Sequence, residues 1–203
     1  MRHLKATGHF RMPWKNGKGE TAEIAVFPEG AGLNDFSWRL SMATVAEPGP
    51  FSSFPGVDRV LAVVEGEGLR LYIEGDMETV TPISDAVSFP GDAAVASDLL
   101  GGPVTDLNLM TRRGICHGRI DRVRGPQHME IEADGLATLV VALSQCVLTG
   151  SRVRDDAADG ELLELGRLDA VALETGDRAM LSSVSGGLDL LTVRIFGEAP
   201  HSR

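Results

Sequence analysis

Two short segments alternate polar and apolar residues, and each places chemically useful side chains on one face of a strand. In residues 36–43 (FSWRLSMA), Arg39 and Ser41 alternate with apolar residues, and side chains two positions apart share a strand face. Residues 106–110 (DLNLM) repeat the pattern with Asp106 and Asn108. A guanidinium grips a carboxylate through a planar fork of N–H groups, and an amide both donates and accepts. Asp106 would either orient Arg39 or accept a hydrogen bond from a ligand.

A third segment, residues 13–19 (PWKNGKG), adds an aromatic ring, a cation and an amide within a glycine-rich stretch. Trp14, Lys15 and Asn16 make a composition suited to a small polar ligand. The spacing lacks the Gly-x4-Gly-Lys-Ser/Thr order of a phosphate loop. An ordinary turn with a packed tryptophan is the alternative here. For the two strand segments, the alternative is a face exposed to solvent instead of the lining of a small barrel.

The sequence predicts neither a metal site nor a catalytic nucleophile. The histidines are scattered and form no H-x-H pair, which argues against a stable metal centre: His3, His9, His117, His128 and His201. Cys116 and His117 are neighbours, so on a strand they would point to opposite faces and could not act as a nucleophile and its base. No serine lies in a G-x-S-x-G context. We therefore expect no catalytic residue, no metal and no cofactor.

Composition and charge exclude several classes of protein. Nineteen basic against twenty-nine acidic residues give a net charge of -10, which disfavours binding to a phosphate backbone. No apolar run approaches the roughly 18 residues that a membrane span needs, and the N-terminus lacks the pattern of a secretory signal. We expect a cytoplasmic protein without a nucleic-acid or membrane partner. Cys116 and Cys146 are expected to be unpaired structural thiols.

The elements that position these residues are predicted to be strands. Twenty-four glycines and ten prolines separate short apolar segments, and few stretches keep a helical period. The expected strands cover residues 21–27, 36–44, 60–64, 69–73, 86–89, 93–97, 105–111, 137–143, 161–165, 170–173, 178–181 and 188–196. This many short strands indicates an all-β sandwich or barrel.

A weak internal repeat indicates a duplicated β-unit. Residues 87–93 (VSFPGDA) resemble residues 172–178 (ALETGDR), and each copy continues through a Gly-Gly pair into a longer strand. We expect an N-terminal half at residues 1–113, a connecting seam at 114–135 and a C-terminal half at 136–203. The seam carries five arginines, which form either a partner surface or a set of solvated charges: Arg112, Arg113, Arg119, Arg122 and Arg124.

Five segments together resemble the HutD/Ves family, named after histidine-utilisation protein D: PWKNGKG (13–19), TAEIA (21–25), FSWRLSMAT (36–44), GPFSSFPGVDR (49–59) and DLNLMTRR (106–113). The match in motifs covers about the first 113 residues. Membership implies an all-β bicupin, with two RmlC-like cupin-type β-barrel or jelly-roll halves in one chain. Many cupins bind a metal through His-x-His. Residues 54–75 contain no histidine, so this sequence departs from that pattern.

The resemblance also implies a function. HutD proteins are similar to proteins encoded with histidine-degradation enzymes, and Ves proteins are tied to stress responses. We expect a metal-free protein that binds a small carboxylate, such as urocanate or formiminoglutamate, and acts as a regulator or sensor in histidine utilisation. The family-like positions that would form its pocket are Trp14, Lys15, Asn16, Arg39, Ser41, Asp106 and Asn108. The alternatives are a metal-independent cupin enzyme that uses Lys15 or Asp106 as acid or base, and a stress-response protein that works through protein contacts. Cupins often pair through strand edges, so a homodimer is possible.

Overall fold

The computed structural model describes residues 1–14, 19–152 and 161–198, and it is all-β as predicted. Within these ranges the chain forms nineteen strands and one short 3-10 helix, Ala6–Gly8. None of the described residues forms a helix that is long and apolar enough to cross a bilayer. The chain divides into two compact units. The first unit is Phe10–Ile120 with Glu198, and the second unit is Met1–His9 with Asp121–Gly197.

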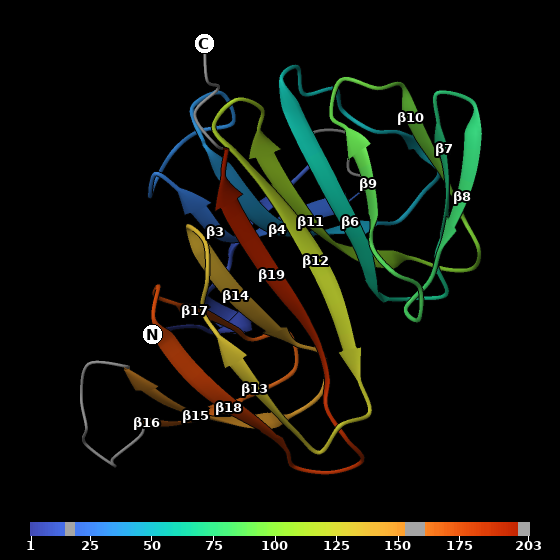
Figure 1. The fold of residues 1–203 in the computed structure, drawn as a ribbon. Coiled ribbons are helices and arrows are strands. Elements are labelled where there is room, and N and C mark those ends of the chain that lie inside the picture. The colour runs from blue at the N-terminus through green and yellow to red at the C-terminus, as the bar shows by residue number, and fades with distance from the viewer. Residues whose placement is uncertain (15–18, 153–160, 199–203) are drawn as a thin grey trace. The chain divides into compact units, whose positions relative to one another are not determined.

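The first unit contains two antiparallel sheets (Figure 1). The six-stranded sheet has the order β2 (Phe10–Pro13), β3 (Gly19–Phe27), β4 (Trp38–Val45), β11 (Val104–Arg112), β6 (Val57–Glu65) and β9 (Val87–Pro90). The four-stranded sheet has the order β5 (Gly49–Pro50), β10 (Val95–Leu99), β7 (Leu69–Ile73) and β8 (Asp76–Val80). A buried apolar cluster joins them, with Leu61 and Val63 from one sheet and Leu69, Leu71 and Val95 from the other.

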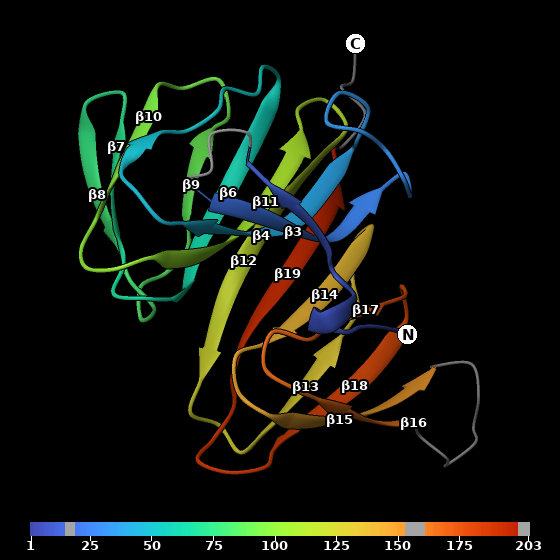
Figure 2. The same ribbon diagram turned by 180° about the vertical axis from the view of Figure 1, so that it is seen from behind.

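The second unit is also built from two antiparallel sheets (Figure 2). The larger has the order β1 (Arg2–Leu4), β17 (Ala170–Leu173), β14 (Ala137–Ala142), β19 (Asp189–Gly197) and β12 (Cys116–Arg124). The smaller has the order β13 (His128–Glu132), β18 (Asp177–Ser183), β15 (Cys146–Arg152) and β16 (Glu161–Leu165). Its core brings Val140 and Leu190 of the larger sheet together with Ile131, Leu148 and Leu181 of the smaller one.

The two units share one strand order. In the first, β4-β11-β6-β9 faces β5-β10-β7-β8, and in the second, β12-β19-β14-β17 faces β13-β18-β15-β16. Each strand of the second series lies eight places after its counterpart in the first. This is the order of a two-sheet jelly roll, and the repeated segments noticed in the sequence fall on matching strands. Among the described residues, strand pairing leaves the two sheets of each unit separate and does not close them into a barrel.

The boundary between the units follows Ile120, inside β12. Residues 114–135, expected as a connecting seam, therefore contain two strands, β12 and β13. Residues 1–9, expected with the N-terminal half (1–113), belong to the second unit, because Arg2 and His3 pair with Ala172 and Val171 of β17. A three-residue edge strand carries too short a pattern to be recognised in a sequence.

Candidate functional site

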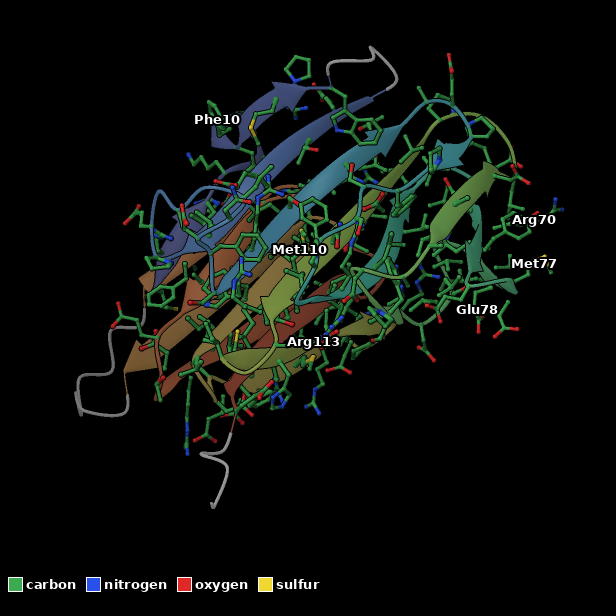
Figure 3. All side chains as sticks on the ribbon, turned by 90° about the horizontal axis from the view of Figure 1, so that it is seen from above. Phe10, Arg70, Met77, Glu78, Met110 and Arg113 are labelled. Carbon is green, nitrogen blue, oxygen red and sulfur yellow. The ribbon has the colours of Figure 1, made fainter. Side chains whose placement is uncertain are left out.

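The six-stranded sheet gathers the polar residues on its inward face. Residues directly opposite one another in an antiparallel ladder share a face. The registers of β4, β11 and β6 therefore give three successive rows on one face: Arg39, Met110 and Arg59; Ser41, Asn108 and Leu61; Ala43, Asp106 and Val63. Leu61 and Val63 belong to the core between the two sheets, so this face points into the unit. In Figure 3, Met110 lies among the interior side chains, whereas Arg70, Met77 and Glu78 project outward.

Arg39 is buried and is held by two partners on the same face. Its Nε donates to Glu23 Oε2 at 2.7 Å, and an Nη atom donates to Ser41 Oγ at 3.4 Å. Glu23 lies on β3, directly opposite Ser41. The carboxylate that orients Arg39 is thus Glu23, which the sequence analysis did not single out, and Asp106 does not have the orienting role that was one of its two expected roles.

Arg59 is a second buried guanidinium that sequence reasoning missed. Its Nε donates to Asn108 Oδ1 at 3.4 Å. Three phenyl rings surround it, with the guanidinium carbon 5.0, 5.8 and 5.2 Å from the centroids of Phe51, Phe54 and Phe89. Such contacts attract a cation while shielding it from water. Burial lowers the pKa of Arg59 to about 10; nearby Asp106 opposes this shift and Arg39 adds to it.

Asp106 is 2% exposed, and its Oδ1 atom has no hydrogen-bond partner. Burial raises the pKa of this carboxyl to about 7, against the attraction of Arg59, which lowers it. A buried polar atom without a partner is costly and rare in native proteins. Asp106 therefore presents an unused oxygen to the interior, under the attraction of Arg59, and its pKa lies near neutral pH.

Trp14 lies at one end of the same face. Its Nε1 donates to Thr21 Oγ1 at 2.9 Å, and Thr21 pairs with Ala43 in the row of Asp106. The backbone of Trp14 also bonds to Gly19, and a side chain at Gly19 would touch the indole ring. Trp14 is therefore a packed ring fixed to β3. Lys15 and Asn16 lie outside the described residues.

The buried group at the centre of the first unit, Arg39, Arg59, Asp106, Asn108 and Ser41, is called the arginine cluster below. Two guanidiniums with an amide and a hydroxyl beside them offer the donors that a carboxylate requires. Asp106 adds one acceptor, or one donor when protonated. Among the described residues, no group of three His, Cys, Asp or Glu side chains is placed to hold a metal ion.

The two cysteines lie in the protein interior, and Arg112 and Arg113 contact neighbouring segments of the first unit. Cys116 and Cys146 are free and buried, as expected, and burial raises the pKa of the Cys146 thiol to about 11. Arg112 donates to the carbonyl oxygens of Phe36 and Asn34. Arg113 pairs with Asp58 and Asp92. Arg112 and Arg113 therefore fasten loops of the first unit.

The second unit provides an internal comparison because its strands match. Leu61 and Val140 match because each faces the core of its unit and pairs with the two matching neighbour strands. Leu61 pairs with Val87 and Asn108, and Val140 pairs with Val171 and Thr192. Extending this correspondence along the ladders puts Thr138 where the first unit has Arg59, and Leu190 where it has Asp106. The arginine cluster is therefore a specialisation of the first unit and no general consequence of this strand order.

Comparisons with known proteins agree with the motifs. The sequence model of the HutD family matches residues 6–191. A Pseudomonas putida protein, described as an uncharacterized 21.2 kDa protein in the hutC 3' region, is 35% identical over 188 residues, or 93% of this chain and 94% of that protein. Protein Ves of Citrobacter koseri is 40% identical over 108 residues, or 53% of this chain and 56% of that protein.

Solved structures give the same result. HutD from Pseudomonas fluorescens SBW25, in a structure described as a formate condition, has a TM-score of 0.75 and 28% identity, covering 98% of this chain and 99% of that chain. A cupin 2 conserved barrel domain protein from Leptotrichia buccalis has a TM-score of 0.57 and 10% identity, covering 95% of this chain and 99% of that chain. The second likeness shows a cupin-like fold and nothing about activity.

Proposed function

The chain belongs to the HutD family, as its motifs predicted, and we propose that it binds a small carboxylate at the arginine cluster as a sensor or regulator in histidine utilisation. Family and fold fit a protein associated with that pathway. The observation that carries the proposal is the burial of two guanidiniums on one inward face, within a chain that is acidic overall. Glu23 accompanies Arg39, whereas Arg59 contacts an amide and three phenyl rings, and a buried cation is costly unless an anion accompanies it.

The proposed binding mode follows from the chemistry of each side chain. Arg39 and Arg59 flank Met110 in one row, and the carboxylate bonds to their N–H groups. Asn108 and Ser41, one row further along, orient the ligand, and Trp14 covers a planar group. Lys15 and Asn16 complete the proposed set. The two units are proposed to be cupin-type halves of a bicupin, a view that their shared strand order supports.

Urocanate and formiminoglutamate are the proposed ligands, and thermal unfolding tests them. Purified, metal-stripped protein is titrated with urocanate, formiminoglutamate, histidine, glutamate and formate, because a ligand that binds only the folded state raises the unfolding temperature. We expect a saturable rise with urocanate or formiminoglutamate that the Arg39→Ala variant loses. No rise with any of the five compounds, together with a rise when metal is added back, would contradict both the ligand class and the absence of a metal.

A second candidate function is a metal-independent enzyme that acts on a related metabolite. Asp106 supports this alternative, because a carboxyl with a pKa near 7 serves as a general acid or base at neutral pH. The two candidates differ in turnover. Proton NMR of each compound after prolonged incubation would show new product peaks for an enzyme and unchanged ligand for a binding protein.

A further inference from the structure

Asp106 shares the inward face of its sheet with charged side chains from three other strands. Arg39 comes from β4, Glu23 comes from β3, and Arg59 and Glu65 come from β6. The buried residues that the opposite sheet turns toward this core are uncharged: Leu69, Leu71, Val80, Val95 and Ser97. Asp76 and Glu78 of its edge strand β8 pair with Ile73 and Leu71 but are exposed to solvent. Of these charged groups, Arg59 is the one whose charge lowers the pKa of Asp106.

Arg59 is the charge that favours the ionised form of Asp106, and the carboxylate is proposed to bond to the N–H groups of Arg59. A bound carboxylate adds a further negative charge to the same buried region, where water screens poorly and an uncompensated charge is costly. Glu23 is already used by Arg39 at 2.7 Å, and its side chain is 22% exposed. Asp106 is the buried member with an oxygen that no hydrogen bond occupies.

We propose that the carboxylate binds to the arginine cluster together with one proton, which Asp106 Oδ1 takes from solvent. This inference rests on the proposed function and adds its regulation, since binding becomes dependent on pH. The protonated carboxyl also gains a donor, which can reach either the ligand or a neighbouring acceptor. No covalent bond forms or breaks apart from the new O–H bond of Asp106.

The direction of the pH dependence follows from linkage. The pKa of Asp106 in the free protein is about 7. A bound anion that pairs with Arg59 offsets the attraction between Arg59 and Asp106, and it therefore raises this pKa. Well below pH 7, Asp106 is protonated before binding, so the affinity does not change with pH. Between pH 7 and the higher pKa of the complex, binding takes up a proton, and the affinity falls by up to about tenfold for each unit of pH.

The direct test is an NMR titration of the Asp106 side-chain carboxyl carbon in the full chain. The midpoint is measured in sodium formate and in sodium chloride at equal ionic strength, since formate stays ionised throughout the range used. We expect a higher midpoint in formate. Amide shifts at Ser41 and Asn108 report separately whether formate binds. Binding without a change in the Asp106 midpoint, or with a lower midpoint, overturns the coupling and leaves the proposed function intact.

A variant gives a second, independent readout. Asp106→Asn imitates the protonated carboxyl and cannot titrate, so its formate affinity should be the same from pH 6 to pH 9, while that of the wild type falls above pH 7. An Asp106→Asn profile as steep as that of the wild type would assign the proton to another group. Failure of formate and of every other carboxylate tested to bind either protein would instead overturn the proposed function itself.

Discussion

At the level of single residues, replacing Arg39 tests ligand binding without preventing folding. Water can hydrate its partner Glu23 once the guanidinium is removed, because the Glu23 side chain is partly exposed. Arg39→Ala removes one of two guanidiniums from the arginine cluster. We expect carboxylate affinity to fall roughly 30-fold or more, which corresponds to about 2 kcal/mol. The free energy of unfolding should fall by about 1–3 kcal/mol for the lost charged hydrogen bonds. Calorimetric titration and urea unfolding measure the two effects.

Arg11→Ala is the matched control for this variant. Arg11 also forms an ion pair with a glutamate of β3, Glu20, but its side chain is 56% exposed and lies on the edge strand β2. Exposed ion pairs contribute about 0–1 kcal/mol, so stability should change little and carboxylate affinity should stay the same. Equal losses of affinity in the two variants would remove Arg39 from the site.

Asp106 also makes stability depend on pH. Its pKa of about 7 in the folded protein lies above the ordinary aspartate value of 3.8. A carboxyl whose pKa is raised by folding stabilises the protein most when protonated, so this contribution is complete below about pH 4 and is lost as the pH rises through 7. The loss reaches at most about 4 kcal/mol. Asp106→Asn should therefore gain stability relative to the wild type between pH 5 and pH 8, as measured by urea unfolding.

The control is Asp76→Asn on the exposed edge strand β8. The difference in unfolding free energy between Asp76→Asn and the wild type should be small, and it should be the same at pH 5 and at pH 8. If Asp106→Asn were equally insensitive to pH, Asp106 would have to titrate at its ordinary, unfolded value, and the raised pKa would be wrong.

The residues of the arginine cluster were partly predictable. Alternation in 36–43 and 106–110 revealed Arg39, Ser41, Asp106 and Asn108 because each alternates with apolar neighbours. Arg59 was missed because β6 is buried on both faces over most of its length, so its apolar run shows no alternation. Its position two residues before Leu61, which faces the core, was the available signal. Glu23 was missed because a register shift between Glu23 and Ala25 changes which residues of β3 face inward.

At the level of elements, the absence of a side chain at Gly19 leaves room for the pairing of β3 with β4 and for the indole ring of Trp14. A Cβ atom there would collide with the Thr44 carbonyl oxygen and would lie 3.0 Å from two ring carbons of Trp14. Gly19→Ala should therefore displace the indole or strain the β3–β4 ladder, at a cost of about 1–3 kcal/mol. Urea unfolding gives the cost, and a change in tryptophan fluorescence reports the displaced ring.

Gly49→Ala on β5 is the control for this contact, because nothing lies within 4 Å of the added Cβ. Its effect on stability should stay within about 0.5 kcal/mol. A similar cost in both variants would show that glycine flexibility, and not the packing of Trp14, accounts for the effect at Gly19.

Long apolar strands were easier to predict than short or highly charged ones. Long apolar strands such as β11 and β19 lie within about two residues of their expected positions because their pattern is strong. The short strands β1 and β5 escaped notice, since two or three residues carry no period. β12 escaped for another reason. Only Cys116 and Ile120 are buried along it, so its charged residues resemble a loop.

At the level of the whole molecule, the two units have one strand order and different interiors. Hydrogen bonding of the backbone fixes the order, while side chains on the inward face differ freely if each core stays packed. Thr138 and Leu190 of the second unit replace a guanidinium and a carboxyl of the first. The repeat in the sequence predicted the shared order. It could not predict this division of roles, because the repeated segments 87–93 and 172–178 contain none of the residues concerned.

This difference predicts where a ligand protects the backbone. Amide hydrogen exchange slows where binding suppresses local opening. A saturating carboxylate should therefore slow exchange in peptides from β4, β6 and β11 of the first unit. Peptides from β14 and β19, at the matching places of the second unit, are the internal control and should change much less. Mass spectrometry of the wild type and Arg39→Ala, each with and without ligand, makes the comparison, and the variant should lose the protection. Slowing confined to β14 and β19 would place the ligand in the second unit and contradict the assignment of the arginine cluster.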